Sequence, residues 1–319
     1  MRFTPPFSPT RFADEPLYWR PPFWSHICGM TGRKKEDPVV RLIVCMLPHS
    51  PSEKEKYGFP QLEQIPMPVS FEVRPVARLS TSHRSEVRPL VGGVSIGAGN
   101  STYGTLGGIV KDQNGVRYGM TCAHVIPSKN QTQQPAIYDD RKAGSIGSSL
   151  ADIALKQCNN IGPCNPYTTD DHISSVDTTL IELDSAIPSS FEILSIGPLA
   201  GVISKNSMTP GQEITFAGRT SGYRTAEVGG LGLFYKLHFK GQTYCYHDLF
   251  EVRWKDCYRT LFGPVVRAGD SGAWVCAETS GGTGWCGQII GEDRRVGYAS
   301  YAENIVTAWG NKGKFLCLA

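Results

Sequence analysis

The chain has 319 residues, a formal net charge of +3, 40% hydrophobic residues and 19% charged residues. This length and hydrophobic content exclude global disorder and predict one large domain with an extension. The small net charge gives no reason to expect nucleic acid or a membrane as a partner. Many glycines and prolines, with short runs rich in Thr, Val, Tyr and Ile, favour short strands joined by turns.

Residues 1–88 are predicted to form an N-terminal extension that is partly irregular. Its beginning is rich in proline and aromatic residues and shows no periodicity. Val39–Cys45 is rich in β-branched residues, and Val69–Arg74 alternates apolar and polar residues, so both are predicted strands. Two strands are too few for a core of their own. We expect these two strands either to pack on the following domain or to mark the end of a larger structural unit that lies upstream.

The start of the chain and the cysteines bear on the cellular compartment. No apolar run typical of a signal peptide follows Met1, and the apolar run Leu42–Leu47 is too short to span a bilayer. None of the ten cysteines pairs with another at C-x-x-C spacing, so no zinc site is expected. We therefore expect a cytoplasmic protein whose thiols are mostly reduced.

Strand-like runs dominate the chain from Gly92 onward. Asp112–Gly115 predicts a hairpin with Asn-Gly at its tip, and the returning run Val116–Thr121 leads to His124. Tyr301–Gly310 has apolar residues at four-residue spacing and predicts a terminal amphipathic helix. The strands predicted between them in the second half are Glu213–Ala217, Leu231–Phe239, Tyr244–Arg253 and Ala273–Cys276.

The segment RAGDSGAW, Arg267–Trp274, predicts a nucleophilic serine. Its glycines permit unusual backbone conformations and a close approach of substrate to Ser271. The N–H groups of Gly269 and Ser271 could then point into one cup that stabilises an oxyanion. A serine needs a base to attack an amide, and His124 in the segment TCAHV is the candidate.

The acid that orients the histidine has two candidates. Asp177 opens the segment DTTLIEL, and Asp152 lies in the segment ADIAL. With either of them the chain order is His, Asp, Ser, which is one of the known orders for this constellation.

Three segments together resemble the trypsin/chymotrypsin-like serine peptidase superfamily. TCAHV is similar to its T-A-A-H segment, DTTLIEL to its D-I-A-L-L-x-L segment and GDSGAWV to its G-D-S-G-x-x-V segment. The runs around Gly92–Val125 and Gly218–Gly222 are nearest to a subgroup found in bacteria, fungi and plants, including the plant narrow-leaf type. The resemblance covers about Pro89 to Trp309.

The resemblance implies an all-β fold of two six-stranded antiparallel barrels with a C-terminal helix. The peptidase domain would span residues 89–319, with barrels at about 89–190 and 191–300 and the helix at about 301–310. It implies a serine endopeptidase that acts on a protein or peptide substrate through His124, Asp177 and Ser271, without metal or cofactor. The resemblance is compatible with a homo-oligomer. The alternative is an inactive member of the fold that serves as a protein-interaction module.

The resemblance also bears on the acid. Asp152 matches the D-I-A-L string more literally. Asp177 has the better context, because Leu183–Pro188 resembles the segment after the acid in the family and because the separation from Ser271 is similar. Asp177 is therefore the predicted acid.

The predicted substrate pocket is also implied by the resemblance. The residue six positions before the serine forms the floor of the main pocket in the family, and here it is Val265. The expected walls by the same comparison are Gly291, Glu292 and Gly297. An apolar floor favours apolar side chains, so we predict a preference for Leu, Val or Ala before the cut bond. Glu292 or Arg267 could reach in and change the charge.

Two further expectations concern activation and disulfides. Leu90–Gly93 is similar to the start of activated family members, yet we predict activity in the uncut chain. Asp270 would then have an intrachain partner, either a basic side chain or backbone N–H groups, because an unpaired buried carboxylate is costly. If the protein is exported, the expected disulfides are Cys158–Cys164, Cys245–Cys257 and Cys276–Cys286.

Overall fold

The computed structural model describes residues 40–46, 69–75, 83–99, 102–137, 139, 143–153, 173–174, 176–239, 241–255, 263–293 and 295–318. The chain divides into two compact units, Met1–Ser80 and Thr81–Ala319. In the first unit, β1 (Val40–Met46) pairs in parallel with β2 (Val69–Pro75), with Val40 opposite Val69. Both strands agree with the sequence prediction within one residue at each end. The Pro-rich beginning of the extension lies outside the described residues.

The first half of the second unit forms a closed ring of antiparallel strands. Its members are β4 (Val94–Ile96), β5 (Gly104–Leu106), β6 (Gly108–Asp112), β7 (Arg117–Thr121), β8 (Gln131–Gln134), β9 (Gly144–Ile153) and β11 (Thr178–Leu183). Strands β6, β7, β11, β9 and β8 are neighbours in this order. The bridge between Gly97 and Gln133 joins β8 to the end of β4, and β4 pairs with β5, which continues into β6. With β5 and β6 taken as one interrupted strand, this is a six-stranded barrel.

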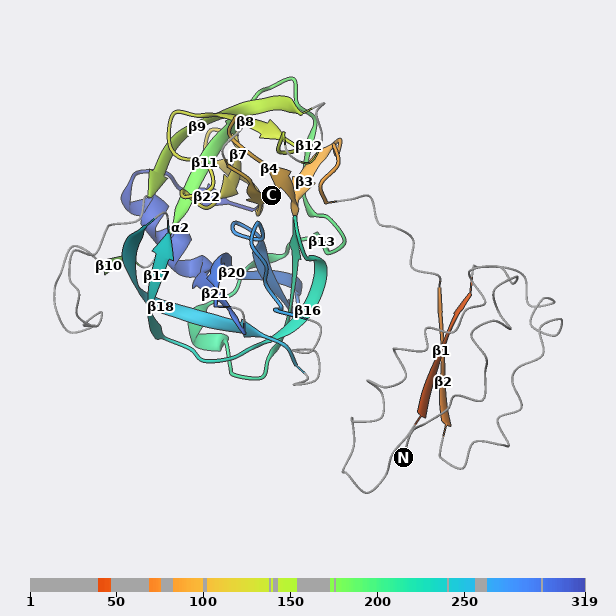
Figure 1. Ribbon diagram of the computed structural model, residues 1–319. Helices are drawn as coiled ribbons and strands as arrows, with labels where there is room; N and C mark the ends of the chain where they lie inside the picture. Colours follow the sequence, from red (N-terminus) through yellow and green to blue (C-terminus); the bar gives the residue numbers. More distant parts are fainter. Residues whose placement is uncertain are drawn as a thin grey trace. The chain divides into compact units, whose positions relative to one another are not determined.

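The second half closes in the same way. Its ring contains β15 (Glu213–Gly218), β16 (Gly222–Val228), β18 (Gln242–Arg253), β21 (Gly297–Tyr301), β20 (Gly282–Glu292) and β19 (Trp274–Thr279). Each of these strands pairs antiparallel with the next, and β19 pairs with β15 to close the ring. The predicted fold class, two antiparallel barrels, is therefore confirmed (Figure 1).

The remaining elements lie around the two rings. Strand β17 (Leu233–Phe239) forms a hairpin with β18, and α2 (Ala302–Asn311) is the predicted terminal helix, with Ile305 and Trp309 buried. The short strands are β3 (Leu90–Gly92), β10 (Ile173–Ser174), β12 (Ser189–Ile193), β13 (Gly197–Pro198), β14 (Gly201–Val202) and β22 (Leu316–Cys317). No helix within the described part of the chain is both long and apolar enough to cross a membrane.

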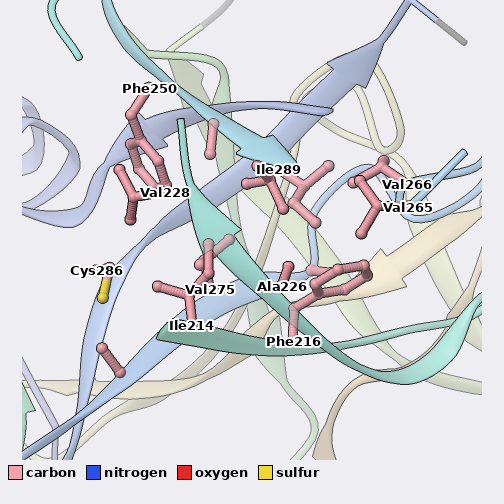
Figure 2. Packing of buried hydrophobic residues seen from close by; sticks show 14 of the residues in the cluster. Ile214, Phe216, Ala226, Val228, Phe250, Val265, Val266, Val275, Cys286 and Ile289 are labelled. Atoms are coloured by element: carbon pink, nitrogen blue, oxygen red, sulfur yellow. The ribbon is translucent and has the colours of Figure 1, made fainter. Parts of the chain in front are cut away.

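The interior of the second barrel explains why its strands close. Alternate residues of each strand point inward, and the inward side chains are aliphatic or aromatic. Figure 2 shows Ile214, Phe216 and Val228 gathered with Phe250 and Ile289 in one cluster. These five side chains are fully buried. Burial of this much apolar surface stabilises the ring, since each large aliphatic or aromatic side chain contributes about 1.5–3 kcal/mol.

The cysteines correct one of the expected disulfides. Cys276 and Cys286 are both free and buried, although β19 and β20 form a hairpin. Cys276 packs with Trp274 and Trp285, whereas Cys286 lies in the core cluster of the second barrel. Cys276 lies opposite Trp285 in the hairpin, and neighbouring positions of a strand point to opposite faces of the sheet, so Cys286 faces the other cluster and the two thiols are not joined. Cys245 is disulfide-bonded, while Cys158, Cys164 and Cys257 lie outside the described residues.

Candidate active site

His124 and Asp177 lie in contact at the end of the first barrel. His124 lies in a turn directly after β7, closed by the bond from Val125 N to Cys122 O at 3.1 Å. Asp177 lies just before β11 and is 1% exposed. One carboxylate oxygen of Asp177 bonds with Nδ1 of His124, and the other accepts the backbone N–H of His124 at 3.2 Å. Two bonds to one acid fix both the ring and the backbone of the histidine.

The register of the sheet explains this contact. Thr179 of β11 lies opposite Thr121 of β7 in an antiparallel pair. Residues that precede Thr179 therefore lie beside residues that follow Thr121, which brings Asp177 to the level of the histidine turn. The other candidate acid, Asp152, lies in β9 on the far side of β11 and accepts the backbone N–H of Ser128 at 3.1 Å.

The turn that carries Ser271 packs on strand β5 of the first barrel. Thr105 in β5 donates two hydrogen bonds to this turn, one to each neighbour of Asp270. The Thr105 N–H donates to Ser271 O at 2.9 Å, and the Thr105 hydroxyl donates to Gly269 O at 2.8 Å. A side chain at Gly104 would meet both Val125 and the backbone oxygen of Ser271. The Ser271 turn and the residue after His124 thus share one neighbour, so the serine and histidine turns lie side by side.

A single carbonyl group also links the two turns. Ile289 O in β20 accepts the backbone N–H of Gly272 at 2.8 Å and the thiol of Cys122 at 3.2 Å. Its neighbour Gln288 donates its amide N–H to Asp177 O at 3.0 Å. Strand β20 of the second barrel therefore holds the serine turn, the segment before His124 and the acid in one arrangement.

The two N–H groups predicted to bind an oxyanion belong to Gly269 and Ser271. Gly269 has φ +97° and Gly272 has φ +95°, a region that favours glycine, so the sequence G-D-S-G matches the backbone it must adopt. Neither Gly269 N nor Ser271 N donates a hydrogen bond to another of the described residues. Both donors are thus available to a ligand.

Asp270 has the intrachain partner that we predicted, in the form of backbone N–H groups. Its side chain is fully buried, and one oxygen accepts the N–H groups of Thr220 and Ser221, both at 2.9 Å. The other oxygen accepts the N–H of Arg267 at 2.8 Å. Three backbone donors stabilise the carboxylate, so this turn is held without a new chain terminus.

Of the predicted pocket residues, Val265 and Gly297 are buried, and Gly291 and Glu292 are partly exposed. Val265 is fully buried in the core cluster, and Val266 lies beside it (Figure 2). A Cβ atom at Gly297 would clash with the side chain of Val266, so Gly297 packs directly on this segment. Gly291 and Glu292, at the end of β20, are partly exposed.

Cys122, His124 and Asp177 bring possible metal-ligand atoms within 4.8 Å of one another. Burial and the nearby carboxylate of Asp177 raise the pKa of the Cys122 thiol well above its usual value. A protonated thiol is a poor ligand, and Asp177 is already bonded to His124. We therefore assign no metal to this group.

The structure of this chain is similar to those of bacterial proteases. The Nocardiopsis protease has 14% identity and a TM-score of 0.46, over 69% of this chain and 96% of that chain. Thermobifida fusca Protease A has 13% identity and a TM-score of 0.47, over 72% of this chain and 98% of that chain. The alpha-lytic protease homolog N4 has 14% identity and a TM-score of 0.49, over 72% of this chain and 99% of that chain. No protein-family profile and no curated protein matches the chain.

Several residues around the site carry no motif that predicts their role. Tyr246 of β18 is buried with its hydroxyl 3.5 Å from Asp177, and burial and that carboxylate raise the pKa of Tyr246 well above its usual value. Thr105 of β5 and Gln288 of β20 are likewise buried, and their side chains donate hydrogen bonds to Gly269 O and Asp177 O, respectively. Thr220, by contrast, belongs to a segment, Gly218–Gly222, that the sequence resemblance includes.

Proposed function

We propose that residues 89–319 form a serine endopeptidase in which Ser271, His124 and Asp177 act as a catalytic triad. The observation that carries the proposal is the pair of hydrogen bonds between His124 and Asp177. The turn that contains His124 packs beside the turn that contains Ser271. An orienting acid, a histidine and a serine on adjoining turns are the groups that acyl transfer needs.

In the proposed reaction, His124 takes the proton of the Ser271 hydroxyl as that oxygen attacks the scissile carbonyl carbon. The N–H groups of Gly269 and Ser271 stabilise the oxyanion of the tetrahedral intermediate. His124 then donates the proton to the leaving amine, and an acyl-enzyme remains on Ser271. Water, deprotonated by His124, attacks the ester and releases the acid. Asp177 keeps the imidazole in the correct tautomer and stabilises its charged form.

We propose an apolar preference for the side chain before the cut bond. Val265 and Val266 belong to the apolar core of the second barrel, and Gly297 packs on this segment. We expect a peptide library to be cleaved mainly after Leu, Val or Ala. A profile dominated by Lys and Arg would contradict this assignment of Val265, Gly291, Glu292 and Gly297 to the pocket.

The direct test of the proposed function is labelling of the purified full chain with a fluorophosphonate probe, which needs an activated serine. We expect one adduct on Ser271, located by peptide mass spectrometry. Intact mass spectrometry should find the label on the uncut chain, because backbone N–H groups already hold Asp270. Label confined to a fragment that starts near Leu90 would show that cleavage is required.

The alternative function, a protein-interaction module with the same fold, makes the opposite prediction. Such a module needs no activated serine, so the probe would leave the native chain unlabelled and peptides uncut. An esterase with the same triad would be labelled, but it would hydrolyse ester substrates and leave amides intact.

A further inference from the structure

The peptide bond between Ala268 and Gly269 is held from outside the serine turn. Thr220, in the turn between β15 and β16, donates its hydroxyl hydrogen to Ala268 O at 2.8 Å. A Cβ atom added at Gly269 would lie 2.6 Å from Thr220 Oγ, so the hydroxyl lies directly against this peptide. In a trans peptide the C=O and N–H groups point in opposite directions. The bond to Ala268 O therefore directs Gly269 N–H away from Thr220.

Neighbouring charges fix the direction of this hydroxyl. Arg219 Nη1 donates to Thr220 Oγ at 3.3 Å, and a guanidinium has only donors. The Thr220 oxygen thus accepts from Arg219, and its single hydrogen is left for Ala268 O. Arg219 is itself held by Asp139, with Nε 2.6 Å from one carboxylate oxygen and Nη2 2.5 Å from the other. Both side chains are buried, and a bidentate pair of this kind is strong and directional.

The Ala268–Gly269 peptide is the central peptide of a turn closed by the bond from Asp270 N to Arg267 O at 2.9 Å, and a glycine in such a turn permits either orientation of that peptide. Gly269 has φ +97°, and glycine has access to a wide range of backbone angles. The other carbonyl groups of the turn have their own partners, since Thr105 binds Gly269 O and Ala273 N binds Asp270 O. Ala268 O is bound by Thr220.

We propose that Thr220 is a positioning residue: its hydroxyl holds the Ala268–Gly269 peptide so that Gly269 N–H faces the oxyanion. This inference rests on the proposed function of the Ser271 site. Thr220 acts through the peptide and does not touch the reacting atoms. Because an oxyanion donor serves the transition state, loss of the hydroxyl should lower kcat and leave KM nearly unchanged.

The test compares Thr220→Val, which removes the hydroxyl, with Thr220→Ser, which keeps it. Thr220→Val keeps the backbone N–H that donates to Asp270, so the fold should persist. We expect kcat for a peptide amide to fall about tenfold or more in Thr220→Val, and to stay within about threefold of wild type in Thr220→Ser. Thr220→Ala repeats the deletion without an added methyl group, and Thr307→Val, on the exposed face of α2, is the matched control.

A second measurement separates positioning from a merely structural role. The Ser271 hydroxyl adds to the carbonyl carbon of a peptide aldehyde, and the oxygen of the resulting tetrahedral adduct takes the place of the oxyanion. The affinity for the aldehyde should therefore fall by the same factor as kcat, whereas KM for the peptide should not change. Equal kcat and equal aldehyde affinity in wild type and the two hydroxyl deletions would overturn the inference. An equal loss in Thr220→Ser would overturn it too. A wild-type protein that neither labels nor cleaves would overturn the proposed function and this inference with it.

Discussion

Replacement of Ser271 by alanine is expected to lower kcat for peptide hydrolysis by about a million-fold. Without the hydroxyl, no acyl-enzyme forms, and only the residual effect of binding and the oxyanion donors remains. The variant should fold normally, because within the described part of the chain Ser271 Oγ makes a single, long hydrogen bond, 3.4 Å to Ile290 O. Rates measured on a fluorogenic peptide, together with thermal unfolding of both proteins, check both parts.

The matched control for this experiment is Ser185→Ala, at an exposed position after β11. It should leave both rate and stability unchanged. Peptide cleavage that persists undiminished in Ser271→Ala, and is blocked by no serine-directed probe, would refute the peptidase proposal for this site.

Replacement of Asp177 by asparagine is expected to lower kcat about ten-thousand-fold. An amide at this position can donate a hydrogen bond to Nδ1 of His124, which stabilises the tautomer that cannot accept the serine proton. The side chain is fully enclosed and nearly the same shape as asparagine, so the unfolding temperature should change far less than the rate. Rate constants and melting temperatures on the same preparations separate the two effects.

Asp152→Asn is the matched comparison for Asp177→Asn. The Asp152 carboxylate accepts the Ser128 N–H and lies on the far side of β11, so we expect nearly wild-type kcat. If the Asp152 variant loses activity and the Asp177 variant keeps it, the assignment of the acid is wrong.

Local features of this protein can be predicted from its residues without the fold. Asn-Gly at residues 114–115 specifies a hairpin, and Gly115 has the positive φ that this turn requires. Four-residue apolar spacing predicts the terminal helix, whose residues Ile305 and Trp309 are buried. Glycines at 269 and 272 mark the serine turn. These features can be predicted from the sequence because each depends on the backbone preferences of a few consecutive residues.

Strands β9 and β16 are not indicated by the sequence pattern. β9 contains two glycines and three serines, which have weak strand preference, and it is held by its neighbours β8 and β11. β16 begins at a glycine and pairs with β15 and β18. Strand formation in these segments depends on partners that are distant in the sequence.

The side chains that surround the serine and histidine turns are set by the tertiary structure. The register of β7, β11 and β9 brings Asp177, and not Asp152, to His124. Two of the three N–H partners of Asp270 come from a turn about fifty residues earlier in the chain, and Cys276 and Cys286 lie in separate clusters although their strands pair. These contacts join segments from different strands and from both barrels. Closure of the barrels brings them together, and no local pattern encodes that closure.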